Sequence, residues 1–142
     1  MKVGVLATMV FATLIGYPVA SFAGLAPDSD SDGIPDVLDK CTLDSRNAAA
    51  TCDTDVDGYG NPCDGDFDQS GTVVSVDFGT YFVPAFKGGS IARGQDMDCA
   101  GGANPANAID FGNFFVPKFK GALGGAIPGP SGLSCAGTAG CM

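Results

Sequence analysis

The apolar side chains of this sequence are concentrated in two copies of one short segment near its C-terminal end. Residues 77–88 read DFGTYFVPAFKG and residues 110–121 read DFGNFFVPKFKG. In each copy aromatic residues recur at positions i, i+3, i+4 and i+8 from the first phenylalanine, which is the spacing of one helix face. We therefore expect two short amphipathic helices whose phenylalanines form the core between them, not a ligand platform. Pro84 and Pro117 are expected to kink or end these helices early.

Ahead of the helices the pattern changes to polar residues with aspartate at alternate positions. Counted from Asp28, the first cluster has aspartate at positions 1, 3, 5, 9 and 12, glycine at position 6 and a backbone carbonyl at position 7. This is the spacing of an EF-hand type calcium loop, because alternate side chains point inward and glycine allows the sharp turn. The expected ligands are Asp28, Asp30, Asp32, the carbonyl of Ile34, Asp36 and Asp39.

The same register follows twice more along the chain, with Gly58 and then Gly71 at position 6. The second cluster offers Asp53, Asp55, Asp57, the carbonyl of Tyr59, Asn61 and Asp64. The third cluster offers Asp66, Asp68, Ser70, the carbonyl of Thr72 and Asp77. Position 9 of the third cluster is Val74, so water or no ligand is expected there. A disordered acidic linker, the alternative, does not predict glycine at position 6 three times.

A less regular cluster precedes the second phenylalanine segment. Counting back from Asp110 puts Cys99 at position 1 and Ala103 at position 5, and these residues cannot form the site. An insertion restores the pattern, with Asp96 and Asp98 at positions 1 and 3. The turn then falls to Gly101 or Gly102, and an added oxygen to Asn104 or Asn107. This loop has fewer carboxylates than the others, and whether it binds calcium is left open.

Composition supports a hard cation held by oxygen ligands. All sixteen acidic residues are aspartate, the formal net charge is −9, and histidine and glutamate are absent. Aspartate is the shortest carboxylate and suits tight loops in which several oxygens converge on one ion. Calcium is therefore the expected cofactor. Magnesium is disfavoured because it keeps its waters, and zinc because the cysteine spacing lacks histidine partners.

The same composition argues against two classes of function. Without histidine, glutamate or tryptophan, the remaining general bases are aspartates already assigned to calcium loops, so no enzyme activity is expected. The strongly acidic balance also argues against a nucleic-acid partner, and the lysines near the helix ends are expected to be solvated or to match the helix dipoles.

The N-terminal segment indicates export. Residues 1–23 combine Lys2, an apolar stretch and small residues near position 23, which is typical of a secretory signal peptide. The apolar run is too short for a membrane anchor, so no membrane span is expected in the mature chain. Export allows the six cysteines to form disulfides, although six cysteines leave many pairings open. Cys135 and Cys141 are candidates to pair across a small loop.

Residues 28–64 contain the segments DSDSDGIPDVLDKC and CDTDVDGYGNPCD and resemble thrombospondin type 3 repeats. The resemblance implies a compact, sheet-poor structure that wraps calcium ions and uses disulfides between successive units. It favours a disulfide between Cys41 and Cys63. Cys52 is an extra cysteine relative to that scheme, and its partner is not assigned.

Residues 64–121 form a calcium loop followed by a short helix, twice, and resemble a dockerin type I module of paired F-hand units. The resemblance implies pseudo-twofold packing, one calcium ion in each unit, and a helix presented to a cohesin partner on a cell surface or scaffold. The insertion before Asp110 departs from the family pattern. The GPSGL motif in the tail is similar to the endings of bacterial secreted proteins of this kind.

The expected fold is a small irregular one stabilised by calcium loops and disulfides. It combines sheet-poor thrombospondin type 3-like repeats (24–64) with a mainly α pair of loop-helix, dockerin-like units (65–121), after a signal peptide (1–23) and before an irregular tail (122–142). The expected function is a secreted calcium-binding module for extracellular binding, adhesion or docking to a cohesin-like protein or cell-surface component. The alternative is a structural subunit that assembles with copies of itself into a matrix or filament.

Overall fold

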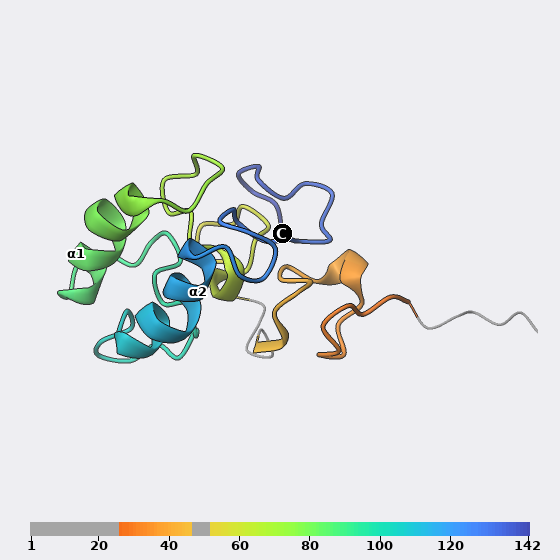
Figure 1. Cartoon of the computed structure of the whole chain (residues 1–142), viewed down its shortest axis with the longest axis horizontal. Helices are drawn as coiled ribbons and strands as arrows, with labels where there is room; N and C mark the ends of the chain where they lie inside the picture. Colours follow the sequence, from red (N-terminus) through yellow and green to blue (C-terminus); the bar gives the residue numbers. More distant parts are fainter. Residues whose placement is uncertain (1–25, 47–51) are drawn as a thin grey trace, which may run out of the picture.

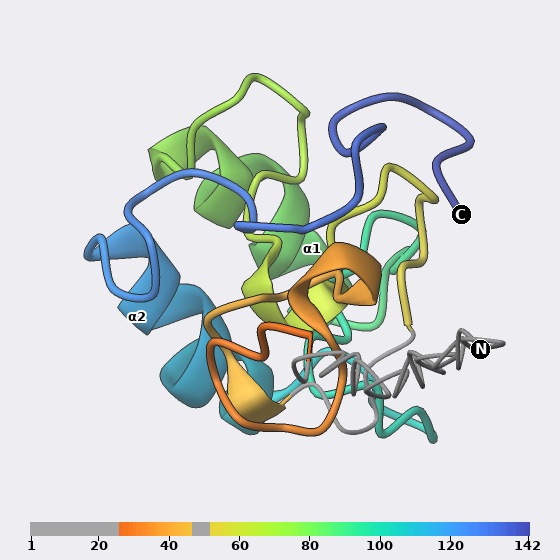
Figure 2. The same cartoon turned by 90° about the vertical axis from the view of Figure 1, so that its right-hand side faces the viewer.

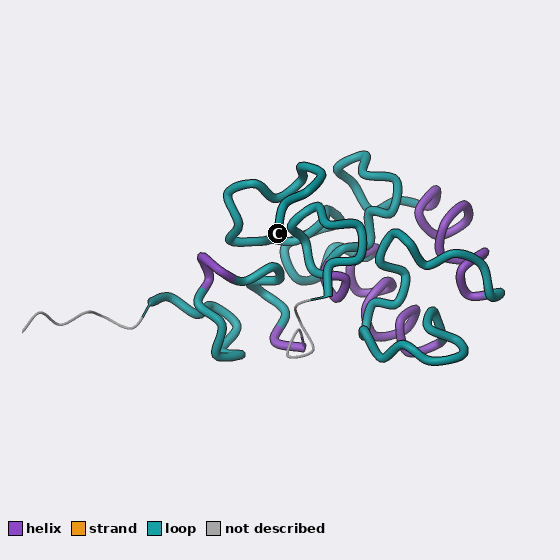
Figure 3. The backbone as a smooth tube through the Cα atoms, turned by 180° about the vertical axis from the view of Figure 1, so that it is seen from behind, coloured by secondary structure: helices purple, strands orange, loops and turns teal. Residues whose placement is uncertain are grey.

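The computed structural model describes residues 26–46 and 52–142. These residues form loops and short helices without a strand, and an isolated bridge pairs Asp57 with Cys141 (Figure 3). The expectation of a small, sheet-poor fold is therefore confirmed. Among the described residues, no helix has the length and apolar character needed to cross a bilayer. The predicted signal peptide lies outside the described residues.

The two phenylalanine segments form helices of matching length, over residues 75–86 and 108–119. The first contains a wide π turn, η4 (Asp77–Phe82), that continues into α1 (Val83–Phe86). The second contains η5 (Asp110–Phe115), which continues into α2 (Val116–Phe119). Both copies of the repeated segment therefore form the helices that the repeat predicted.

Each helix changes its winding at its proline. In the first helix the N–H of Val83 donates to the carbonyl of Phe78, five residues back, and Pro84 follows. Proline has no N–H to donate, so it fits where the wide turn gives way to α turns. The first helix continues to Phe86, and the second repeats this arrangement at Pro117. Of the two effects expected of the prolines, ending the helix does not occur, and each proline instead marks a change from π to α turns.

The core is small and lies between the two helices and the chain segments that lead into them. The rings of Phe82 and Phe115 face each other with centroids 5.4 Å apart, and Phe67 stacks on both, at 6.2 and 5.8 Å. The buried cluster consists of Phe67, Val73, Phe82, Met97, Phe114 and Phe115. Three phenylalanines of the repeated segments thus form the predicted core.

The other four phenylalanines of the two segments remain partly exposed, so the expectation that all of them are core is wrong. We call Phe78, Phe86, Phe111 and Phe119 the phenylalanine face; they are 37%, 49%, 36% and 43% exposed. The rings of Phe78 and Phe111 touch, with centroids 5.4 Å apart. Apolar hollows of about 190 and 370 Å³ lie beside this pair, and both rings line each hollow.

Three disulfides join all six cysteines. Cys41 bonds to Cys63, as the resemblance to thrombospondin type 3 repeats implied. Cys135 bonds to Cys141 across a short loop, which confirms the second expected pair. The remaining bond, between Cys52 and Cys99, connects segments far apart in sequence and assigns the partner that the sequence left open.

The C-terminal tail runs back between the helices and the first aspartate loop, as Figures 1 and 2 show. Its backbone is hydrogen bonded to the earlier loops, for example Thr42 N–H to the carbonyl of Pro130 (3.0 Å) and Gly137 N–H to the carbonyl of Asp57 (2.8 Å). A side chain at Gly132 would overlap the carbonyl of Asp36. The tail is irregular, as expected, but it also ties the loops together.

Lys118 anchors the tail to α2 from inside the protein. Its side chain is buried, and Nζ donates to the carbonyls of Leu123 (2.8 Å) and Gly129. Burial lowers the pKa of Lys118 to about 8, while the charges of Asp64 and Asp44 oppose this shift. The corresponding residue of the first helix is the buried Ala85.

Candidate metal centres

Four segments fold into the same tight turn, and we call them loop 1 (28–39), loop 2 (53–64), loop 3 (66–77) and loop 4 (96–110). Position 6 of each is a glycine with positive φ: Gly33 (94°), Gly58 (91°), Gly71 (87°) and Gly101 (65°). Position 4 also has positive φ in each loop: Ser31 (65°), Val56 (59°), Gln69 (58°) and Cys99 (57°). Positive φ is uncommon outside glycine, so its recurrence at one position defines a shared backbone geometry.

The same hydrogen bond closes each turn. The position 6 N–H donates to Oδ2 of the first aspartate: Gly33 to Asp28 (3.0 Å), Gly58 to Asp53 (3.0 Å), Gly71 to Asp66 (2.6 Å) and Gly101 to Asp96 (3.0 Å). One oxygen of each first aspartate is thereby fixed to the backbone. The alternative left open for loop 4 is resolved in favour of Gly101 as the residue at the turn.

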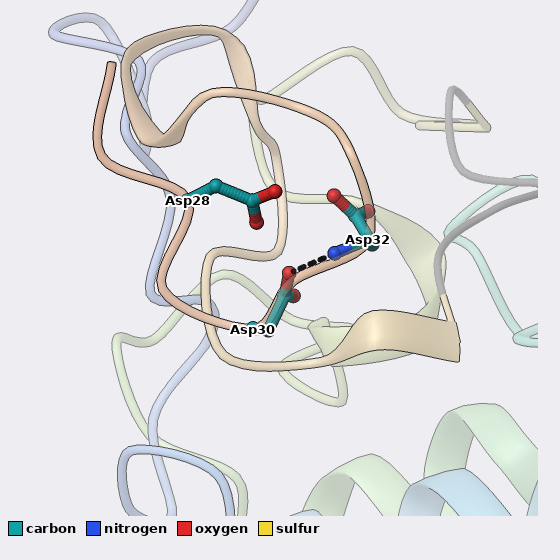
Figure 4. A group of neighbouring side chains, drawn as sticks. All are labelled: Asp28, Asp30 and Asp32. Carbon is teal, nitrogen blue, oxygen red and sulfur yellow. Dashed lines mark hydrogen bonds between the residues drawn. The ribbon is translucent and has the colours of Figure 1, made fainter. Parts of the chain in front are cut away.

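In each loop three carboxylates converge. Their oxygens lie within 4.8 Å of one another in the sets Asp28, Asp30 and Asp32; Asp53, Asp55 and Asp57; Asp66, Asp68 and Asp77; and Asp96, Asp98 and Asp110. Figure 4 shows the loop 1 set, in which the backbone N–H of Asp32 donates to Oδ1 of Asp30 (3.2 Å). All of these carboxylates are among the residues that the sequence proposed as ligands.

Loops 3 and 4 also use their last aspartate in the same way. In loop 3, Asp77 accepts hydrogen bonds from the N–H groups of Asp68 (3.2 Å) and Val74 (2.8 Å). In loop 4, Asp110 accepts from Asp98 (2.9 Å) and Asn107 (2.7 Å). Both carboxylates are fully buried at the start of a helix. The inserted residues of loop 4 thus leave both ends of the loop in place.

Several predicted ligands lie outside the three-carboxylate sets. Asp36 accepts hydrogen bonds from N–H (2.7 Å) and Oγ (2.8 Å) of Ser29. Buried Asp39 accepts from the N–H of Cys41 (2.8 Å), and buried Asp64 accepts from the N–H of Asp66 (3.1 Å). These carboxylates hold the loop backbones together.

The non-carboxylate ligands predicted in loops 1, 2 and 3 are placed differently from one another. Ser70 donates from its hydroxyl to Oδ1 of Asp66 (3.2 Å) and to the carbonyl of Thr72 (3.2 Å), so both lie at the loop 3 cluster. Ile34 and Tyr59 donate their N–H groups to Oδ1 of the position 5 aspartates, at 2.7 and 2.9 Å. Asn61 is buried and bonds to Thr54 and to loop 4.

The two asparagines proposed as extra ligands of loop 4 differ in their surroundings. Asn104 is exposed. Asn107 accepts from the N–H of Ile109 through Oδ1 (2.8 Å), and its own N–H donates to Oδ2 of Asp110 (2.7 Å).

Negative charge accumulates in these loops with little compensation. Burial, together with the charges of Asp55, Asp53 and Asp66, raises the pKa of Asp57 to about 6, although an N–H bond from Tyr59 opposes the shift. Burial is also the first cause of the raised pKa values of Asp30, Asp55, Asp66, Asp77, Asp96 and Asp110. Within the described residues, Lys40 makes the ion pair to these sets, with Asp53 (2.9 Å).

Buried carboxylate oxygens in loops 1 and 4 indicate a fit to a cation. Oδ2 of Asp30, Oδ2 of Asp32 and Oδ1 of Asp96 are buried and have no hydrogen-bond partner among the residues that the structure describes. Asp96 as a whole is only 8% exposed. An unpaired buried carboxylate oxygen is costly, and a hard cation with oxygen ligands removes that cost. Zinc fits poorly, because all cysteines are in disulfides and the chain has no histidine.

Neither a protein family nor a curated protein nor a solved structure matches this chain. The loops themselves therefore carry the evidence for function. Sequence reasoning missed the positive φ at position 4, the placement of Asn61 and the contacts of the tail. The residue types at position 4 share no feature, so no signal for that geometry was present.

Proposed function

We propose that this protein is a secreted, non-catalytic calcium-binding module whose loops are stabilised by calcium in four aspartate clusters. The observation that carries the proposal is one backbone turn repeated four times, each time around three converging carboxylates. Calcium takes six to eight oxygen ligands in flexible geometry, so carboxylates, carbonyls, hydroxyls and waters can complete each site. Three disulfides are compatible with an extracellular protein.

The charge of the chain supports the proposed number of ions. Four divalent cations nearly balance the formal net charge of −9. Without such ions, each loop holds carboxylates together in a partly buried turn, where their mutual repulsion opposes folding. The resemblances to thrombospondin type 3 repeats and to a dockerin module support the same conclusion, because both families are built around calcium loops.

Calorimetry of residues 24–142 tests this proposal. Titration with calcium should show binding, and magnesium or zinc should bind much more weakly. Calcium at one hundred times its dissociation constant should stabilise the fold by about 2.7 kcal/mol for each site, so excess EDTA should lower the melting temperature clearly. Unchanged melting in EDTA, together with no heat of calcium binding, would remove the proposal.

The phenylalanine face favours a second candidate function, self-assembly of the secreted protein. With about 200 Å² for each phenylalanine side chain, the four exposed fractions correspond to roughly 330 Å² of aromatic surface. A monomer's largest apolar patch is typically about 300 to 600 Å² and often functional, and a stable interface covers about 800 Å² on each partner. The face therefore has the size of the apolar centre of an interface.

A second copy of this chain is the occupant that the shape of the face favours. The Phe78–Phe111 pair forms a wall between two hollows, so a projection lies beside a cavity. Such a surface can pair with itself about a twofold axis, the wall of each copy entering a hollow of the other. Calcium binding assists by reducing the charge repulsion between copies.

Sedimentation equilibrium with and without calcium tests self-assembly. The calcium-loaded protein should form dimers or larger particles, and the double variant Phe86→Ser with Phe119→Ser should be monomeric. Val37→Ser with Leu38→Ser is the matched control, because these residues are 64% and 66% exposed and lie outside the face. A calcium-loaded protein that stays monomeric at all concentrations would exclude self-assembly and leave docking to a cohesin-like protein or another cell-surface component.

A further inference from the structure

Loops 2 and 4 are joined by a disulfide that borders both carboxylate clusters. Cys52 directly precedes Asp53, the first aspartate of loop 2, and Cys99 directly follows Asp98, the second aspartate of loop 4. Cys99 also occupies position 4 of loop 4, where φ is positive. The bond therefore connects the backbone at the entrance of one cluster to the turn of the other.

Asn61 makes a second connection between the same two loops. Its Oδ1 accepts from the N–H of Thr54 in loop 2 (2.9 Å), and its Nδ2 donates to the backbone carbonyl of Asp96 in loop 4 (2.9 Å). Gly94 packs so closely that a Cβ there would lie 3.0 Å from Oδ1 of Asn61. Asn61 is 3% exposed, so water does not compete for these bonds. One buried side chain thus fixes the first aspartate of loop 4 to the backbone of loop 2.

Asp96 is also the residue of loop 4 with an unpartnered buried oxygen, Oδ1. Its other oxygen is held by the N–H of Gly101 (3.0 Å) and its carbonyl by Asn61. The position of this carboxylate in loop 4 therefore depends on how well loop 2 is ordered.

We infer that loops 2 and 4 form a coupled pair of calcium sites, in which an ion in either loop raises the affinity of the other through Asn61 and the Cys52–Cys99 disulfide. The inference rests on the proposed calcium function. An ion bound in loop 2 orders the segment between Cys52 and Asn61, so loop 4 loses less conformational freedom when it binds its own ion. Such coupling is reciprocal: each site changes the affinity of the other by the same factor.

Electrostatics alone predicts the opposite sign. A divalent cation in loop 2 makes that region less negative, which lowers the attraction of a second cation to loop 4. Emptying loop 2 would then leave the affinity of loop 4 unchanged or increase it. Coupling through the covalent and hydrogen-bonded connection instead predicts that emptying loop 2 weakens loop 4. The direction in which the affinity of loop 4 changes therefore distinguishes coupling through the connection from electrostatics alone.

The position 6 glycines provide a reporter for each loop. Gly33, Gly58, Gly71 and Gly101 each donate an N–H to the first aspartate of their own loop, so a cation on that carboxylate should shift the amide resonance. Proton–nitrogen correlation spectra of residues 24–142, recorded through a calcium titration, therefore give an apparent affinity for each loop. No enzymatic activity is needed for the measurement.

Three comparisons test the inference. Asp55→Asn, which removes a central ligand of loop 2, should weaken calcium binding at Gly101 by about 5-fold or more, the lower end of typical coupling. Asp98→Asn should weaken binding at Gly58 by the same factor. Asp30→Asn in loop 1 is the charge-matched control. It should leave unchanged the calcium midpoint of the Gly101 amide, which is the calcium concentration at which its resonance is half shifted, because no disulfide or hydrogen bond of the described structure joins loops 1 and 4.

Cutting the connection should abolish the effect. In a protein that already carries Asn61→Leu, adding Asp55→Asn should change the calcium midpoint of the Gly101 amide by roughly 2-fold or less. If Asn61→Leu does not fold, the double variant Cys52→Ser with Cys99→Ser serves as the background for the same comparison. An unchanged or tighter Gly101 midpoint in Asp55→Asn alone would overturn the coupling. If no glycine amide responds to calcium, the proposed function itself fails. Four responding amides with independent midpoints would preserve that function and refute the coupling.

Discussion

Replacing Asp55 by asparagine should change the stability of the protein in opposite directions with and without calcium. Asp55 lies in the loop 2 set, where its carboxylate oxygens are within 4.8 Å of those of Asp53 and Asp57. Asparagine has nearly the same shape and still accepts a hydrogen bond, but it carries no charge. In the calcium-free protein the substitution removes repulsion, whereas in the calcium-loaded protein it removes a ligand.

The expected magnitude follows from the geometry of loop 2. Two unit charges about 4.8 Å apart repel by about 1 kcal/mol in water and about 3 kcal/mol at an effective dielectric constant of about 20. Burial is the first cause of the raised pKa of Asp55, and the Asp53 charge adds to it, while Gln69 donates to Asp55 and opposes the shift. We therefore expect Asp55→Asn to stabilise the calcium-free protein by about 1 to 2 kcal/mol and to destabilise the calcium-loaded protein by about 2 to 3 kcal/mol.

Urea unfolding at pH 7, in excess EDTA and in excess calcium, measures both free energies of unfolding. Asp36→Asn is the control, because the Asp36 carboxylate accepts two hydrogen bonds from Ser29 and lies outside the set of three. This control should lower stability by a similar amount in both conditions. If Asp55→Asn also lowers stability equally in EDTA and in calcium, its carboxylate has a structural role and the reasoning about the cation is wrong.

Three further predictions concern the pH dependence and the tail. The pKa of Asp57 is raised from 3.8 to about 6, so between these pH values the folded calcium-free protein keeps a proton that the unfolded chain releases. The free energy of unfolding of the calcium-free protein should therefore fall as the pH rises from 4 through 6. A free energy of unfolding that rises over this range in calcium-free denaturation experiments would contradict the prediction. Gly132→Ala should destabilise the protein by at least about 1 to 3 kcal/mol, because the added methyl group would overlap the Asp36 carbonyl. Gly79→Ala should instead stabilise the protein by about 0.5 to 1 kcal/mol, because Gly79 lies in a helix with open space around it. Thermal melts of the two variants check both signs. The pKa of Lys118 is lowered from 10.5 to about 8, so the unfolded chain binds the Lys118 proton more tightly than the folded protein does. The free energy of unfolding should therefore rise with pH above 8. Urea unfolding from pH 7.5 to 9.5 should show this rise in the native chain and a smaller rise in Lys118→Met.

The parts of the structure that the sequence predicted are those whose cause is local. Glycine at position 6 indicated a sharp turn, and Gly33, Gly58 and Gly71 lie in such turns with positive φ. The aromatic spacing indicated helices, and both formed over the expected residues. In each case the residue type and its neighbours in sequence determine the conformation.

The parts that the sequence did not predict depend on which segments meet in space. Helical spacing places Phe78, Phe82 and Phe86 on one face, but the packing of Phe67 and of the second helix decides that Phe82 is buried and the other two are not. The tail contacts the loops mainly through backbone groups, which carry no residue signature. The pairing of Cys52 with Cys99 likewise depends on the approach of loops 2 and 4.

The distribution of apolar residues predicts that a bound cation matters most for loops 1 and 2. All six side chains of the core cluster come from residues 67 to 115. Among the described residues between 26 and 64, the buried apolar side chains are Pro62 and the disulfide-bonded Cys41 and Cys63. Loops 1 and 2 therefore have almost no hydrophobic contribution to offset the entropy of ordering their backbone. Their order depends on the disulfides, on hydrogen bonds to the tail and on whatever neutralises their aspartates. Since those aspartates repel one another when no ion is bound, we propose that calcium takes the role in this half of the protein that the phenylalanine core has in the other.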